Sequence, residues 1–338
     1  MDTKFIIAGV CVALALLYAF SNGFHDSGNI IASMVSSRAM TPNAALFLAC
    51  VFEFAGAYFL GSKVAMSMAY SIVNPLNFPG VYSGVVLAAA LAAAVVWNAA
   101  TWRMGMPSSS SHTLIGSIFG AFTYGFGIRS LEMSSIIPII IIMFAAPIVC
   151  FFLTYAASGI FFFFGRWFKP GINKLINMGQ IASSAGMALA SGSNDAQKAV
   201  GVILFALAVL GYSGKPEGTI IPVWVAASCA FFLSAGILFG GFRVAKTMGM
   251  RLCKIRPAQG FTAQTSSFLV LTASNLMGFP VSATQAAASS IMGADATGGF
   301  KRVRWNVFIS IAYTWAVTMP AAFLLGYVFC FFLSLVRT

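Results

Sequence analysis

The chain has 338 residues, of which 59% are hydrophobic and 8% charged, and its mean hydropathy is +0.91. A soluble domain carries about 25% charged residues, so this composition excludes a soluble enzyme and a DNA-binding protein and predicts a protein of the lipid bilayer. The net charge of +12 then indicates basic cytoplasmic loops rather than a surface for nucleic acid.

The apolar runs are long enough to cross a membrane, because a helix rises about 1.5 Å per residue and a bilayer core is about 30 Å thick. The first segment, 4–34, begins like a signal peptide, because Lys4 precedes the apolar run 5–20, but it lacks a cleavage site and we expect it in the mature protein. Polar residues interrupt this segment near 22–29 and a second segment, 176–212, near 192–198. Uninterrupted runs cover residues 44–61, 81–100, 134–164, 219–241, 261–278 and 305–335.

The order of these features occurs twice. Asp26 in the first interrupted segment precedes Pro107 by 81 residues, and Asp195 in the second precedes Pro280 by 85 residues. The proline stretches read P-S-S-S-S-H and P-V-S-A-T-Q, and each leads into a short apolar arm, ending near 127 and 293. We therefore predict two homologous repeats, residues 1–164 and 176–338, joined by a cytoplasmic linker at 165–175.

The basic residues indicate the topology. We place the N-terminus outside, let each interrupted segment cross once, and let each proline stretch form the tip of a hairpin. Twelve basic residues then lie inside and five outside, as the positive-inside rule requires. The inside set is Arg38, Arg166, Lys169, Lys174, Arg243, Lys246, Arg251, Lys254, Arg256, Lys301, Arg302 and Arg304; the outside set is Lys4, Lys63, Arg129, Lys215 and Arg337. The predicted fold is an all-α polytopic inner-membrane protein with two inverted-topology repeats, interrupted helices, two re-entrant-type helical hairpins and both termini extracytoplasmic.

Two buried acids and two proline-led helix starts carry the chemistry. An unpaired carboxylate in a membrane costs about 3 kcal/mol, and the matching positions of Asp26 and Asp195 favour function over a carboxylate capped by neighbouring amides. Nearby Asn and Gln side chains add hard oxygen ligands for a small cation. A helix start rich in serine attracts anions, so two such starts facing each other would hold a tetrahedral oxyanion.

Other polar residues have two interpretations each. His25 either carries a proton or is a neutral hydrogen-bonding spacer, and His112 and its counterpart Gln285 can both donate to an oxyanion. Glu53 either relays a proton or cation or pairs with a helix dipole or Lys63. Lys198 either neutralises Asp195 or snorkels to the surface. Six cysteines without C-x-x-C spacing predict no disulfide framework and no structural metal site, and no cofactor is expected.

With these residues in view, the chain resembles the inorganic phosphate transporter (PiT) family. The family's duplicated G-A-N-D type motif corresponds to N-G-F-H-D-S-G-N at 22–29 and G-S-N-D-A-Q-K at 192–198, and its duplicated P-[VA]-S-[ST]-[ST]-H type motif to residues 107–112 and 280–285. The N-G-F-H-D form, together with W-N-A-A-T-W ahead of Pro107, is similar to the bacterial low-affinity branch. That branch moves phosphate with protons, often as a neutral metal–phosphate complex.

The resemblance implies symport of inorganic phosphate driven by H+ or Na+. Carried onto matching positions, the phosphate ligands are Ser109, Ser110, Ser111, Ser282 and Thr284, and the cation ligands are Asp26, Asn29, Asn194 and Asp195. Two positions depart from the pattern, because Ala283 replaces a hydroxyl and Gln285 a histidine. The coupling ion, co-transport of a divalent metal and assembly into a homo-oligomer stay open.

Three alternatives compete with this interpretation. A sulfate carrier of the same architecture is the nearest, and a passive anion channel is another. From a different class, Ser108 to Ser111 beside His112 could serve an intramembrane serine hydrolase, but no G-x-S-x-G motif is present and neighbours on one helix start rarely align for attack. We therefore predict a transporter and not an enzyme.

Overall fold

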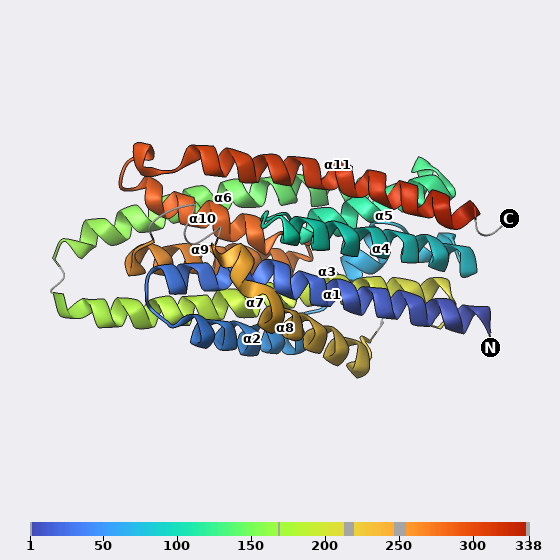
Figure 1. Cartoon of the computed structure of the whole chain (residues 1–338), viewed down its shortest axis with the longest axis horizontal. Coiled ribbons are helices and arrows are strands. Elements are labelled where there is room, and N and C mark those ends of the chain that lie inside the picture. Colours follow the sequence, from blue (N-terminus) through green and yellow to red (C-terminus); the bar gives the residue numbers. More distant parts are fainter. Residues whose placement is uncertain (1, 168–169, 213–219, 247–254, 336–338) are drawn as a thin grey trace.

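The protein is described by a computed structural model that covers residues 2–167, 170–212, 220–246 and 255–335 (Figure 1). Within these ranges all regular elements are helical, which confirms the all-α prediction. The α-helices are α1 (Thr3–Ser36), α2 (Pro42–Phe59), α3 (Lys63–Met66), α4 (Val81–Arg103), α5 (Ser110–Phe126), α6 (Met133–Gly165), α7 (Asn173–Val209), α8 (Val223–Lys246), α9 (Pro257–Met277), α10 (Ala283–Ala296) and α11 (Trp305–Leu335).

Six helices of the described chain are long and apolar enough to cross a membrane: α1, α2, α4, α6, α11 and the Val223–Gly240 part of α8. The outer helices α6 and α11 expose rows of large apolar side chains such as Phe152 and Phe332, as expected of surfaces that face lipid. Helix α7 is less apolar but is buried along most of its length. The chain is therefore a multi-pass membrane protein. The five described cysteines are free, and Cys253 lies outside the described residues.

The predicted interruptions of segments 4–34 and 176–212 are wrong, because α1 and α7 run through both polar stretches as continuous helices. The glycines in these stretches serve close helix packing instead. A Cβ atom on Gly23 would overlap the backbone of Leu233 in α8, and one on Gly192 would overlap the backbone of Glu53 in α2. Small residues at such crossings are typical of membrane helices. Several of the polar side chains, such as His25 and Asn194, bond to neighbouring helices.

We expect Gly192→Ala to lower the free energy of unfolding by about 3 kcal/mol, the upper end for overpacking a protein interior, because the added methyl group meets backbone that cannot turn away. The matched control is Gly9→Ala, since a Cβ atom at Gly9 has nothing within 4 Å. Thermal unfolding of the purified variants measures the difference. Equal melting temperatures for the two variants would contradict this account of the α2–α7 crossing.

The chain does contain a helix break, between α2 and α3, close to the predicted end of the run 44–61, but the sequence did not predict α3 beyond it. The side chain of Gln197 in α7 closes it: Val64 N and Ala65 N donate to its Oε1 over 2.9 and 3.3 Å, and its Nε2 donates to Leu60 O over 3.0 Å. The hydroxyl of Ser193 also donates to Leu60 O, over 2.7 Å. Backbone groups freed within a bilayer need such partners, since no water replaces them. A π-helical turn, Ser67–Ser71, follows α3.

The helices pack in matched pairs. Helix α1 packs on α8 as α7 packs on α2, α5 packs on α11 as α10 packs on α6, and α1 packs on α4 as α7 packs on α9. The hairpins α4–α5 and α9–α10 lie in opposite halves of the long axis and approach each other near its middle (Figure 1). Helix α1 begins and α11 ends at one end of the molecule, and the α6–α7 link lies at the other (Figure 1).

Candidate functional site

The two proline-led stretches meet inside the protein, as predicted. Ser109 caps the start of α5 by accepting from His112 N over 3.2 Å, and Ser282 caps the start of α10 by accepting from Gln285 N over 3.4 Å. Ser111 at the first tip donates to the carbonyl oxygen of Val281 at the second over 3.1 Å. Two helix starts, each with hydroxyls and a positive dipole end, therefore lie side by side.

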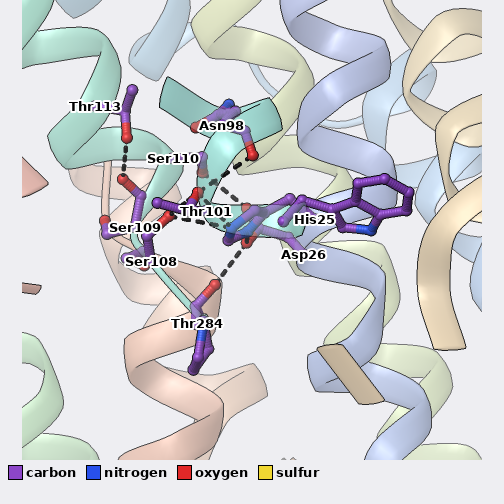
Figure 2. Close-up of polar contacts among 12 residues, drawn as sticks. His25, Asp26, Asn98, Thr101, Ser108, Ser109, Ser110, Thr113 and Thr284 are labelled. Carbon is purple, nitrogen blue, oxygen red and sulfur yellow. Dashed lines mark hydrogen bonds and ion pairs between the residues drawn. The ribbon is translucent and has the colours of Figure 1, made fainter. Parts of the chain in front are cut away.

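Asp26 joins both tips. Its Oδ2 accepts from the Ser110 hydroxyl over 2.7 Å, its Oδ1 accepts from the Thr284 hydroxyl over 2.5 Å, and Oδ1 lies 3.2 Å from His25 Nδ1 (Figure 2). The carboxylate is 2% exposed, so it faces the protein interior and not lipid. One buried acid thus holds a hydroxyl from each hairpin.

The residue before each aspartate binds the hairpin beside it. His25 Nε2 lies 3.3 Å from Thr101 Oγ1 and 3.1 Å from Ser108 Oγ, both in the α4–α5 hairpin (Figure 2). Asn194 Nδ2 in the other half donates to Asn275 Oδ1 over 2.5 Å and to Phe279 O over 3.2 Å, both in the α9–α10 hairpin. These contacts are compatible with both interpretations of His25, the proton carrier and the hydrogen-bonding spacer. The two residues attach α1 and α7 to the tips.

Asp195 is neutralised within its own helix. Lys198 Nζ lies 2.5 Å from Asp195 Oδ1, and Ser191 Oγ donates to Oδ2 over 3.0 Å. The same ammonium donates to Ser111 Oγ at the tip of the first hairpin over 2.7 Å. Lys198 is fully buried, so the snorkelling interpretation is wrong and the neutralising one is confirmed. Removal of either partner would leave an uncompensated charge inside the protein, which is strongly destabilising.

The remaining predicted residues are buried close by. Glu53 has one carboxylate oxygen without a hydrogen-bond partner, and no ion pair joins it to Lys63 among the described residues, so that pairing is wrong. His112 Nδ1 lies 2.5 Å from Ser109 Oγ, and its Nε2 is unpartnered. The Oε1 of Gln285 is likewise buried and unpartnered. The side chain of Asn29 lies outside the described part of the structure.

Sequence reasoning missed several side chains that complete the site. Tyr18 donates through its hydroxyl to Ser110 O over 3.1 Å, and Thr101 holds His25 together with Ser108, which the sequence had suggested only for a hydrolase. Helical spacing could have found some of them, because residues four or eight positions apart share a face. Tyr18 stands eight positions before Asp26, and Ser191 stands four positions before Asp195.

Ser108, His25 and Asp26 lie in the order hydroxyl, imidazole, carboxylate, which is the order of a hydrolase triad. The same carboxylate, however, is also bonded to Ser110 and Thr284, and the histidine also to Thr101. Comparison with known proteins decides between a hydrolase and a carrier. A profile of the phosphate transporter family matches residues 22–169 and 165–326.

The chain belongs to the phosphate transporter family. It is 36% identical over 340 residues to a Bacillus subtilis protein named "Probable low-affinity inorganic phosphate transporter", covering 99% of this chain and all of that one. A Rhizobium meliloti protein of the same name is 35% identical, with 95% of this chain and 94% of the relative covered. These relatives are transporters, so the prediction that the chain is not an enzyme is confirmed and the hydrolase alternative has no support.

The fold of this phosphate transporter family member is also found in a solved structure titled "The sodium-dependent phosphate transporter". The TM-score is 0.88 at 20% sequence identity, and the match covers 98% of this chain and all of the other. At that identity the likeness shows the fold alone. The helices of this chain are therefore arranged as in that solved structure.

Proposed function

We propose that the protein is a secondary active transporter that moves inorganic phosphate together with a cation, H+ or Na+, by alternating access. The observation that carries the proposal is the position of Asp26, where one buried carboxylate accepts hydroxyl hydrogen bonds from both hairpin tips. The phosphate ligands would be Ser109, Ser110, Ser111, Ser282 and Thr284. Asp26, Asn29, Asn194 and Asp195 would form the cation and coupling side.

The coupling would be an exchange of hydrogen bonds. In this structure the hydroxyls of Ser110 and Thr284 donate to Asp26, and the same hydroxyls are the proposed donors to phosphate. A carboxylate and an anion compete for them, and their like charges repel. A proton or Na+ on Asp26 neutralises the carboxylate and frees the hydroxyls for the anion. The cation would therefore have to bind before phosphate is held tightly.

Alternating access would use two inverted repeats, divided at residues 165–175. The matched helix pairs support this division, as do the hairpins in opposite halves of the long axis, which would enter the membrane from opposite sides as re-entrant elements. The links that carry Arg38, Arg166 and Lys301 lie at the end opposite both termini (Figure 1). By the positive-inside rule that end would be cytoplasmic and the termini extracytoplasmic.

Uptake into proteoliposomes tests the function. We expect labelled phosphate to accumulate against its gradient when a pH gradient or a sodium gradient is imposed, and the effective gradient identifies the coupling ion. Unlabelled sulfate in excess should not compete, and omission of Mg2+ tests whether a metal–phosphate complex is the cargo. Phosphate that only equilibrates would indicate a passive channel, and preferential sulfate uptake would indicate the sulfate carrier.

In the same assay, Ser110→Ala should raise the phosphate concentration at half-maximal uptake about tenfold, because it removes one hydroxyl donor worth about 1.5 kcal/mol to an anion. Ser228→Ala is a matched control, since that hydroxyl donates only to Val225 O within α8. Both variants should keep the wild-type far-UV circular dichroism spectrum, so that a changed apparent affinity reports on the site and not on the fold. An unchanged apparent affinity in Ser110→Ala would exclude the tip hydroxyl as a ligand.

A further inference from the structure

The two acid sites are built differently, although they occupy equivalent positions in the repeats. The residue four positions before the acid is Asn22 in α1 and Ser191 in α7, and the residue three positions after it is Asn29 in α1 and Lys198 in α7. Both acids lie on continuous helices, so each pair of positions shares the same helical relation to its acid. An amide in one half is thus replaced by an ammonium in the other.

The α7 site is complete without any added ion. Lys198 Nζ contacts Asp195 Oδ1, and the Ser191 hydroxyl occupies the other carboxylate oxygen. The lysine is 0% exposed, and its ammonium also reaches Ser111 at the first hairpin tip. A single positive charge therefore sits between the second acid and the proposed phosphate ligands.

The α1 site, in contrast, holds no ammonium among the described residues, although both oxygens of Asp26 accept hydroxyl hydrogen bonds and His25 Nδ1 lies beside one of them. No lysine or arginine in the described part of the chain forms an ion pair with Asp26. Asn22, one helical turn before it, is fully buried, and neither its Oδ1 nor its Nδ2 has a partner. A buried amide is rarely left unbonded, so both polar atoms of Asn22 are available to a ligand.

We propose that Lys198 is a tethered counter-ion that takes the place of a second co-transported cation. The ammonium fills the position at Asp195 that a mobile ion would occupy, so that only the Asp26 side, with the Asn22 amide, exchanges a cation during transport. The same ammonium supplies fixed positive charge to the phosphate site through Ser111. The proposal rests on the proposed function and deepens it: each phosphate travels with one fewer cation than two open acid sites would require.

The test replaces Lys198 by the amide that stands at the equivalent position of the first half, in the variant Lys198→Asn. The wild type, this variant and the charge-preserving control Lys198→Arg are purified and melted without phosphate, in sodium chloride and in N-methyl-D-glucamine chloride, at several pH values. We expect the Asn variant alone to gain a cation effect, as a melting temperature that rises by about 2 °C with Na+ or on acidification beyond the wild-type response. The double variant Asp195→Asn, Lys198→Asn should lose this gain. Identical responses of the wild type and Lys198→Asn would overturn the proposal.

A second measurement needs no variant. The charge moved per labelled phosphate by wild-type proteoliposomes, added to the negative charge of the transported phosphate ion, gives the number of cations, and we expect one; two would overturn the tethered counter-ion. The two failures can be told apart. If the wild type moves no phosphate, the proposed function falls, while the melting comparison still decides whether Lys198 stands in for a cation.

Discussion

Asp26→Asn should reduce phosphate accumulation to the passive level, with an initial uptake rate at least about 100-fold below that of the wild type. The amide carries no charge to hold a cation, and it weakens hydrogen bonds to a charged acceptor that are worth roughly 3 kcal/mol together. Both hairpin tips, through Ser110 and Thr284, lose their common acceptor. Labelled phosphate uptake into proteoliposomes, with and without an ionophore that collapses the gradient, measures the loss.

The control for this variant is Glu132→Gln, which removes a carboxylate from the residue preceding α6 rather than from the buried site. It should transport like the wild type. Reconstituted Asp26→Asn should have a normal far-UV circular dichroism spectrum, so that lost uptake reports on the site and not on the fold. Gradient-driven accumulation by Asp26→Asn at the wild-type level would remove the carboxylate from the coupling mechanism.

Asp195→Asn should destabilise the protein by about 3–5 kcal/mol, because it leaves the fully buried ammonium of Lys198 without its counter-charge. Removal of both charges in Asp195→Asn, Lys198→Met should recover most of this stability, since no unpaired charge is then buried. Thermal unfolding in detergent compares the two variants. If the double variant melts no higher than the single one, the ion pair does not account for the stability of this region.

The sequence predicted the parts of the fold that depend on composition and on repetition. The apolar runs predicted the long helices, and the duplicated acid and proline stretches predicted that a buried acid meets both hairpin tips, as Asp26 meets Ser110 and Thr284. The pairing of Lys198 with Asp195 was one of two open interpretations. It follows from a spacing of three, which brings two side chains together on one helix face.

The errors have a common physical origin. Gly23 and Gly192 look like helix breakers, but their effect depends on a neighbouring helix whose backbone lies against them, and that neighbour is far away in the sequence. Helix α3, after the break that follows Phe59, was missed for the converse reason, because its partner Gln197 lies in the other half of the chain. Local propensity is a weak guide wherever tertiary partners complete or forbid a backbone hydrogen bond.

The closure of that break by Gln197 limits which parts of the molecule can move. The side chain spans the end of α2 and the beginning of α3, and Gly56 and Gly192 press α2 and α7 together on the same face. Separation of these helices would leave backbone N–H and C=O groups without hydrogen-bond partners inside the membrane. We therefore expect α2, α3 and α7 to travel as one rigid body, so that the distance between Glu53 and Asp195 stays fixed while the hairpins rock against them.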